Sequence, residues 1–482
     1  MIPVLKYART LALLAVTGLP CFALAAPMRP NIVLMMADDL GWGDVQCFRA
    51  QSPIHTPHLD AMAASGMRFT RFYAAAPVCS PTRGSCLTGR HPYRYGVYGA
   101  NKGHLKAEER TLAELLKHHG YATGHFGKWH LGTLTTTLRD SNRGRPGSKQ
   151  HFSPPQANGF DICFSTEAKV PTYDPMLRPA GRGRQRTWDF IRDKPSAAAY
   201  GTHYWDERGE VVTGNLEGDD SRVIMDRVLP FVRNATHRQQ PFFAVIWFHA
   251  PHLPVVAGPK HAERYAQYDT YAKNYYGCVT ALDEQAGRLR RSLQELGIAD
   301  NTLVWFGSDN GPEGKAGSAP GSAGPFRGRK RSLYEGGIRV PGIVEWPGQI
   351  KAGSVTDVPA VTSDYLPTIL DMLGIAPVDD RPLDGTSLLP LLQGRMQTRP
   401  TPIGFQSHNQ MALVTERYKL YSSNAGKTWE LYDLVHDPSE KVDISGQHGE
   451  TVESLRRQLE AWRESCARSD REQDYNVPRS SP

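Results

Sequence analysis

Cysteine is sparse in this chain and follows no regular pattern. The seven cysteines are spread widely and unevenly over 482 residues, which excludes the dense framework of a small disulfide-stapled domain. Internal repeats are also lacking. The basic residues form no stripe interleaved with aromatic side chains, so we expect no nucleic acid partner.

Long hydrophobic runs are lacking too, except at the N-terminus. No run after residue 25 is long enough to cross a bilayer as a helix, so no membrane span is expected. Lys6 and Arg9 precede the apolar run 11–19, and Ala23-Leu24-Ala25 supplies small residues for cleavage. This pattern predicts a signal peptide over residues 1–25, with export to the periplasm or the exterior.

The excess of positive charge is small. Cleavage after Ala25 would remove two basic residues and no acidic one, so the formal net charge would fall from +7 to +5. That charge is compatible with an acidic substrate. The length exceeds what one ordinary core holds, which predicts one large and one smaller domain.

Three apolar runs fit strands that are buried on both faces: residues 31–36, 241–248 and 302–306. Helical patterns over residues 111–119 and 269–296 alternate with them. This alternation predicts an α/β fold with a large mixed, mostly parallel sheet flanked by helices. We assign this main domain to residues 26–395.

Two further regions differ from that alternation. Residues 133–215 are rich in glycine, proline and arginine with little periodicity, which predicts a variable loop region that shapes the substrate site. After residue 395, short strands within 411–421 and 428–433 precede a helical pattern over 451–466. Residues 396–482 are therefore predicted to form a small antiparallel sheet-plus-helix domain.

Polar residues follow the three predicted strands where each one ends. Asp38 and Asp39 follow the first strand, His249 and His252 the second, and Asp309-Asn310 the third. Sites in open α/β sheets form at these carboxyl ends. The aspartates and the asparagine offer only oxygen, which suits Ca²⁺, or alternatively Mg²⁺. The competing interpretation is that these pairs cap a helix and open a turn.

The most informative motif is CSPTRGSCLTGR, residues 79–90. It places a thiol, a proline and an arginine before a predicted helix start, where free N–H groups favour an anion. The pattern Cys-x-Pro-x-Arg resembles the maturation signature of type I sulfatases, in which the cysteine is oxidised to formylglycine. Conversion of Cys79 would leave five other cysteines after residue 25, so at least one buried free thiol is expected.

The resemblance extends from about residue 29 to residue 440. It rests on five segments in the family's order: NIVLMMADDLGWGD (31–44), CSPTRGSCLTGR (79–90), GYATGHFGKWHLG (120–132), GSDNG (307–311) and LYEGGIRVP (333–341). It implies a formylglycine-dependent sulfatase of the alkaline phosphatase superfamily, matured by a formylglycine-generating enzyme. The expected substrate is a sulfated small molecule or glycan.

The resemblance also implies a metal site. Asp38, Asp39, Asp309 and Asn310 would bind the cation, and the modified Cys79 would complete the site. Arg83, one helical turn after Cys79, would lie against the formylglycine and the metal carboxylates. Its permanently charged fork suits that place better than a lysine.

Four further residues would handle the sulfate and the protons. Lys128 would bind the formylglycine oxygen and a sulfate oxygen, and Lys330 would bind sulfate as well. His130 would take a proton from the second hydroxyl group, and His252 would protonate the leaving alcohol. Because Lys128 and His130 are two apart, an extended segment would project both side chains to one face.

Several alternatives remain open at this point. His249 could replace His252, and Lys330 could be a solvated charge beside Arg329 and Arg331. The arginines within residues 178–186 either form a pocket for further anionic groups or belong to a solvated loop. A phosphodiesterase or phosphonate hydrolase of the same superfamily, or a non-catalytic sulfoglycan-binding protein, are the rival functions.

Overall fold

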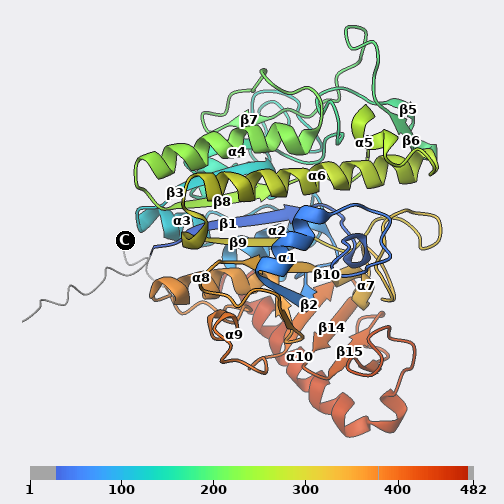
Figure 1. Ribbon diagram of the computed structural model, residues 1–482. Helices are drawn as coiled ribbons and strands as arrows, with labels where there is room; N and C mark the ends of the chain where they lie inside the picture. The colour runs from blue at the N-terminus through green and yellow to red at the C-terminus, as the bar shows by residue number, and fades with distance from the viewer. Residues whose placement is uncertain (1–28, 378, 476–482) are drawn as a thin grey trace, which may run out of the picture.

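The computed structural model describes residues 29–377 and 379–475, so the predicted signal peptide lies outside the described residues. A ten-stranded sheet forms its centre, in the order β11-β2-β10-β9-β1-β8-β3-β4-β7, with β12 beside β2 (Figure 1). Its strands are β1 Asn31–Ala37, β2 Met67–Tyr73, β3 Ala122–Lys128, β4 Ile162–Thr166, β7 Trp205–Asp206, β8 Phe242–Trp247, β9 Thr302–Ser308, β10 Arg339–Glu345, β11 Ser354–Thr356 and β12 Ala360–Val361.

The sheet is mostly parallel, as predicted. Strand β1 runs parallel to both β8 and β9, and β3 runs parallel to both β8 and β4. Only β10 and β7 pair antiparallel with their neighbours. The three predicted strands are therefore confirmed as β1, β8 and β9, and they lie next to one another with β1 in the middle.

Helices cover both faces of the sheet (Figure 1). Along β1, Val33 and Met35 pack into one core with α1, α4 and α6, whereas Ile32 and Leu34 pack into the other with α2, α3, α8 and α9. This period of two is what a strand buried on both faces requires. The helices are α1 Pro57–Ser65, α2 Cys79–Thr88, α3 Leu112–His118, α4 Asp220–His237, α5 Pro259–Glu263, α6 Thr270–Glu295, α7 Glu335–Ile338, α8 Tyr365–Leu373, α9 Leu389–Leu392 and α10 Gly449–Asp470.

The predicted helices 111–119 and 269–296 are confirmed as α3 and α6, and side chains set their starts. Thr111 and Glu114 form a capping box at α3, and the Asp269 carboxylate accepts from the Ala272 N–H at α6. Each cap satisfies backbone donors that the first helical turn leaves unpaired.

The region 133–215 is more regular than the sequence indicated. Strands β4 and β7 extend the main sheet, and β5 Ala180–Arg182 and β6 Thr187–Asp189 form a separate hairpin. These strands are two to five residues long and are polar or rich in small residues, so they carry little hydrophobic periodicity. The chain between them is irregular, as expected.

The C-terminal part contains a four-stranded antiparallel sheet with α10 packed against it. Its strands are β13 Ile403–Ser407, β14 Gln410–Val414, β15 Tyr418–Ser422 and β16 Glu430–Asp433. The opposite face shares a core with Tyr73 and Val361 of the main sheet. The sheet-plus-helix prediction is confirmed, and the division at residues 395/396 stays a prediction.

A buried ionic cluster lies between the two sheets. The Lys419 ammonium on β15 pairs with the Glu335 carboxylate at 3.0 Å and the Glu440 carboxylate at 2.8 Å. Glu335 also contacts Arg339 at 3.3 Å, and all four residues are buried. Mutual pairing is what allows these charges to leave water.

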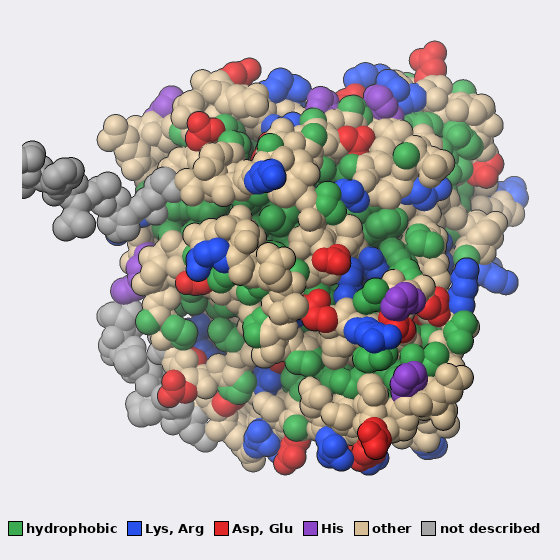
Figure 2. All heavy atoms as spheres, turned by 60° about the horizontal axis from the view of Figure 1, so that its bottom comes forward, with side chains coloured by type: hydrophobic (Ala, Val, Ile, Leu, Met, Phe, Trp, Pro, Cys, Tyr) green, Lys and Arg blue, Asp and Glu red, His purple; other side chains and the backbone are tan. Residues whose placement is uncertain are grey.

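Within the described residues, no helix is long and apolar enough to span a bilayer. All six cysteines in this part of the chain are unpaired, and five of them are buried, which confirms the predicted free thiols. On the face shown in Figure 2, basic and acidic side chains are interspersed.

Candidate active site

The carboxyl ends of β1 and β9 bring the acidic residues together. Ala37 and Ser308 are partners in the parallel ladder, so the residues that follow them emerge side by side. The Asp309 N–H donates to the Ala37 carbonyl at 3.2 Å, and the Asp39 N–H donates to the Asp309 carboxylate at 3.1 Å. The alternative in which these pairs only cap a helix or open a turn is wrong, because the two pairs converge.

Two buried oxygen atoms in this cluster have no hydrogen-bond partner among the described residues. Asp38 Oδ1 and Asn310 Oδ1 are buried and accept no hydrogen bond from the described residues. The Asn310 amide donates instead to Asp39 Oδ1 at 2.7 Å, which orients its own oxygen. Orphaned buried oxygens are costly unless a ligand satisfies them. A hard divalent cation, which prefers six to eight oxygen ligands, fits this donor set.

Cys79 lies beside the acidic cluster. It is the first residue of α2 and is 2% exposed. Its Sγ and carboxylate oxygens of Asp38 and Asp309 lie within 4.8 Å of one another, and so do atoms of Asp38, Asp39 and His252. Burial raises the pKa of the Cys79 thiol, although Lys128 and Lys330 oppose that shift. The unmodified residue is therefore a neutral thiol, a weaker nucleophile than a thiolate.

Arg83 is held one helical turn after Cys79, as predicted. Its guanidinium donates from Nε and Nη2 to Asp309 Oδ2, at 3.1 and 2.7 Å, and from Nη1 to the Lys128 carbonyl at 2.8 Å. It also lies over the Trp247 ring, 5.2 Å from the centroid. The arginine thus ties α2 to β9 and β3 in a fully buried position.

The two lysines approach the acidic cluster from different elements. Lys128 ends β3 and donates to Asp38 Oδ2 at 2.5 Å. Lys330 comes from the loop before α7 and lies 2.6 Å from Asp39 Oδ1, with its side chain 5% exposed. The alternative of a solvated surface lysine is therefore wrong. Burial alone would lower the pKa of Lys330, but the negative charges of Asp39 and Asp38 and the hydrogen bond to Asp39 act together against burial and raise that pKa.

Burial and opposite charges act against each other on Asp38. Burial alone would raise the pKa of its carboxyl, but the positive charges of Lys128, Arg83 and Lys330 help to hold that pKa well below its usual range. Asp38 is thus kept ionised, as a metal ligand must be.

His252 lies at the rim of the cluster, with its side chain 14% exposed and its Nε2 3.7 Å from Asp39 Oδ2. Its Nδ1 is 2.7 Å from the Leu253 carbonyl, which leaves Nε2 directed toward the site. Burial lowers the pKa of His252 to about 4, against the pull of Asp38 and Asp39. A bound anion would favour its protonated form.

His249 does not join the site. It is fully buried, and its ring nitrogens contact Asp220 Oδ2 and Thr166 Oγ1, both at 2.8 Å. The alternative in which His249 replaces His252 has no geometric support. Trp129, next to Lys128, is buried and stacks on Trp247 with ring centroids 6.1 Å apart.

His130 enters the site differently from the prediction. The residue has φ +58°, so the expected extended backbone from Lys128 to His130 is wrong: β3 ends at Lys128 and the chain turns. The His130 Nε2 lies 3.0 Å from Asn101 Oδ1, and its buried Nδ1 has no partner in the described chain. The contact with Asn101 therefore fixes the orientation of the ring, and Nδ1 remains available to accept or donate a proton.

Three residues near the site escaped the sequence analysis. Asn101 orients His130, and Glu313 lies 3.5 Å from the Lys330 ammonium. Lys169 follows β4, and its pKa is lowered by burial and by the positive charges of Lys128 and Lys330. All three come from irregular segments, where no periodic signal marks them.

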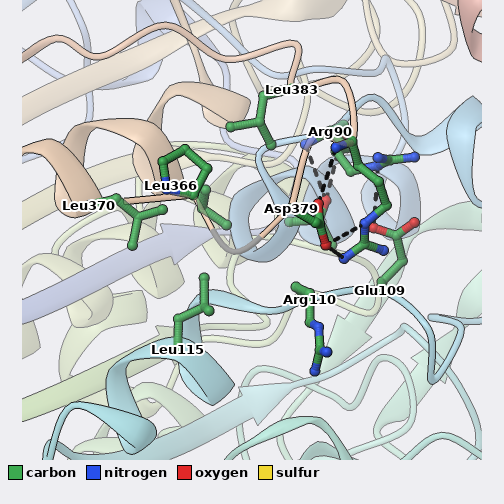
Figure 3. Close-up of a pocket in the computed structure, with 11 residues that line it drawn as sticks. Arg90, Glu109, Arg110, Leu115, Leu366, Leu370, Asp379 and Leu383 are labelled. Atoms are coloured by element: carbon green, nitrogen blue, oxygen red, sulfur yellow. Dashed lines mark hydrogen bonds and ion pairs between the residues drawn. The ribbon is translucent and has the colours of Figure 1, made fainter. Parts of the chain in front are cut away.

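A small cavity lies at the end of α2 opposite to Cys79. Thr88 lines it, nine residues after Cys79, which corresponds to about 14 Å along the helix axis. Its volume of about 40 Å³ has room for water only, far below that of an organic-ligand pocket. Figure 3 shows leucines on one side and charged groups on the other: Leu115, Leu366, Leu370, Leu383, Arg90, Glu109 and Asp379.

The ten-stranded main sheet and the helices on its two faces form the alkaline phosphatase-like fold. The solved structure of Ps i-CgsB in complex with k-i-k-neocarrahexaose matches with a TM-score of 0.75 and 27% identity, over 90% of this chain and 92% of that one.

A family model described as Sulfatase matches residues 30–375, and one described as N-sulphoglucosamine sulphohydrolase, C-terminal, matches residues 324–465. N-acetylgalactosamine-6-sulfatase of Rattus norvegicus is 34% identical over 92% of this chain and 81% of its own length. Arylsulfatase A of Homo sapiens is 33% identical, with coverage of 93% and 89%. The chain belongs to the sulfatase family, whose members are sulfuric ester hydrolases.

Proposed function

We propose that this sulfatase removes sulfate from a sulfated carbohydrate, with a formylglycine made from Cys79 as nucleophile and Ca²⁺ as metal. The observation that carries the proposal is the placement of Cys79 within 4.8 Å of the Asp38 and Asp309 carboxylates at a helix start. Two relatives support the substrate class: one is named for a sulfated amino sugar, and one structure contains neocarrahexaose.

In this proposal the cation is held by Asp38, Asp39, Asp309 and Asn310, with the modified residue 79 beside it. The unpaired oxygens of Asp38 and Asn310 support this set. Oxygen-only ligands favour Ca²⁺, which tolerates irregular geometry better than Mg²⁺. The bound cation would stabilise negative charge on the sulfate oxygens.

A hydrated formylglycine supplies two hydroxyl groups on one carbon, one to attack sulfur and one to lose a proton when sulfate is released. Cysteine offers one thiol and no hydroxyl group, so maturation by a formylglycine-generating enzyme is required. Arg83 holds the start of α2 against Asp309 and thereby fixes where residue 79 lies.

The two lysines bind the sulfate group. The Lys128 and Lys330 ammonium groups both contact the carboxylates of the cluster and therefore flank the position next to residue 79. A sulfate ester is already anionic, so a nucleophile approaches it against negative charge. Two fixed cations offset that repulsion and stabilise the charge that grows on the equatorial oxygens.

The two histidines move protons. His252 donates from Nε2 to the oxygen of the departing alcohol as the sulfur–oxygen bond breaks, because the bound sulfate favours its protonated form. His130 accepts the proton of the second hydroxyl group at its unpartnered Nδ1. Asn101 holds the opposite ring nitrogen and so orients the imidazole.

We also propose that the chain is exported. The basic, apolar and small-residue pattern over residues 1–25 is the support for this, and cleavage after Ala25 would yield a periplasmic or secreted enzyme.

The experiment compares the full chain, matured with a formylglycine-generating enzyme, with its Cys79→Ala variant. Peptide mass spectrometry reports the modification, and released sulfate is measured on an aryl sulfate and on sulfated mono- and oligosaccharides. We expect sulfate release from the sugars only with modified residue 79. Faster hydrolysis of an aryl phosphodiester would favour a phosphodiesterase, and binding of sulfated sugars without any release would favour a binding protein.

A further inference from the structure

A groove beside the active site has no role in the chemistry described so far. It has a volume of about 580 Å³ and lies between the β5–β6 hairpin and the segment after His252. The hairpin also contacts α6, where the Asn274 amide donates to the Trp188 carbonyl at 2.9 Å (Figure 1). Its lining consists of Lys169, Arg178, Pro179, Gly181, Gly183, Arg184, Arg186, Trp188, Tyr200, Leu253 and Pro254.

The lining carries four positive charges and no carboxylate. Lys169, Arg178 and Arg184 form no ion pair with any of the described residues. Arg186 is oriented by a hydrogen bond of 3.1 Å to the Tyr271 hydroxyl and lies over that ring. Elsewhere in the same region arginines do find carboxylates, as Arg208 does with Asp206 at 2.8 Å. A groove with unmatched cations favours an anionic ligand.

The groove adjoins the proposed catalytic centre at two of its lining segments. Leu253 and Pro254 directly follow His252, the proposed proton donor to the leaving alcohol. Lys169 is close enough to Lys128 and Lys330 for their charges to lower its pKa, in addition to the effect of burial. A substrate whose sulfate lies between those two lysines would therefore extend, on its alcohol side, toward the groove.

The remaining lining suits a sugar. Trp188 and Tyr200 are partly buried and offer flat apolar surface, and two glycines of the hairpin leave space above it. Gly181 has φ +87°, and a Cβ there would lie 1.9 Å from the Thr187 carbonyl oxygen, so this position excludes other residues. The backbone geometry of the hairpin thus requires a glycine at position 181, and this keeps that part of the groove free of side chains.

We propose that this groove binds a second anionic group of the substrate, a sulfate ester or a carboxylate, on the sugar next to the one that bears the scissile sulfate. Arg178 and Arg184 supply the contacts, and Arg186 and Lys169 supply fixed charge between them and the catalytic lysines. The inference rests on the proposed function and narrows its substrate to a polyanionic oligosaccharide.

The test uses the matured full chain and its Arg178→Ala/Arg184→Ala double variant. Arg182→Ala is the matched control, because Arg182 is exposed on the same hairpin and does not line the groove. Sulfate release is followed on an aryl sulfate, a singly sulfated neutral disaccharide, a disulfated disaccharide, and a singly sulfated disaccharide with a uronate.

We expect the double variant to raise KM at least about 10-fold on the dianionic disaccharides, since it removes two charge-assisted contacts to the second anionic group. The aryl sulfate and the neutral disaccharide should change less than about twofold, and Arg182→Ala should match the parent. A rise in KM on the disulfated disaccharide alone identifies the second anionic group as a sulfate ester. A rise in KM on the uronate-containing disaccharide alone identifies it as a carboxylate.

Equal effects on all substrates, or no effect on the dianionic ones, would overturn the proposal while leaving the sulfatase assignment intact. If the parent enzyme with modified residue 79 releases no sulfate from any of these sugars, the proposed function itself fails. A separate readout is the salt dependence of KM, which the double variant should weaken on dianionic substrates only.

Discussion

Arg83 and Asp309 form a fully buried pair in which one carboxylate oxygen accepts from both Nε and Nη2 of the guanidinium, at 3.1 and 2.7 Å. The third contact of Arg83, to the Lys128 carbonyl, links the pair to β3. One side chain therefore sets the distance between the helix that bears Cys79, the Asp309 carboxylate after β9 and the Lys128 end of β3.

Arg83→Lys should lower kcat by at least about 100-fold, because a single ammonium cannot reproduce three donors in a planar fork. Arg94→Lys is the matched control, since Arg94 is also buried and binds Asp384 through two nitrogens outside the site. Steady-state kinetics and thermal melting should show a loss of Tm in both variants but a loss of kcat only in Arg83→Lys. An Arg83→Lys enzyme with parental kcat would contradict the role given to this residue.

Removal of the metal should abolish activity and lower Tm, because it would leave the buried oxygens of Asp38 and Asn310 without any partner. The protein is dialysed against a chelator, its metal content is measured by mass spectrometry, and Ca²⁺ or Mg²⁺ is returned. Ca²⁺ should restore both Tm and activity at a lower concentration than Mg²⁺ does. Asn310→Ala should reduce the bound metal at a given free concentration, and unchanged content would argue against this ligand set.

Lys419→Met should destabilise the protein by about 3–5 kcal/mol, because it leaves Glu335 and Glu440 buried without their shared cation. The expected result is a lower midpoint of denaturant unfolding, with kcat unchanged for the protein that remains folded. Lys427→Met, at an exposed position of the loop between β15 and β16, is the control. A drop in kcat without a stability loss would mean that the C-terminal sheet acts on the active site.

His91 should make stability sensitive to acid. Burial lowers the pKa of this residue to about 4, although Asp384 opposes the shift, and its ring contacts Trp462 of α10 at 4.8 Å. Because the folded pKa lies below the unfolded value of 6.5, the stabilisation is present above pH 6.5 and is lost as the pH falls toward 4. The difference corresponds to about 3 kcal/mol.

The measurement for His91 is the pH dependence of Tm between pH 7 and 4.5. In the parent, His91 Nδ1 accepts a hydrogen bond from the Tyr93 N–H and caps the turn that follows. His91→Asn keeps an acceptor at this position, but its side chain does not gain a proton as the pH falls. It should therefore show a shallower decline than the parent. His436→Asn, at an exposed position, should decline like the parent. Parallel curves for His91→Asn and the parent would rule out this contribution.

Hydrophobic patterning was enough to predict the central strands β1, β8 and β9 and the helices α3 and α6. The outer strands β3 and β4 were missed, because ATGHFGK and ICFST contain glycine and polar residues and owe their strand form to pairing with neighbours. Likewise, the short hairpin β5–β6 has no apolar period, so the groove beside it was predicted only as a pocket or a solvated loop.

For this protein, the amino-acid sequence alone determined the chemistry on offer: a cysteine in a maturation motif, oxygen ligands after two strands, and lysines and histidines in recognisable segments. These features lie in short local segments, so the sequence reveals them through its patterns and its resemblance to the family. Tertiary structure decided that Asn101 orients His130, that Lys330 is buried against Asp39, and that unpaired arginines line a groove beside His252. Those relationships join irregular segments far apart in the chain, and only packing around the sheet sets their distances.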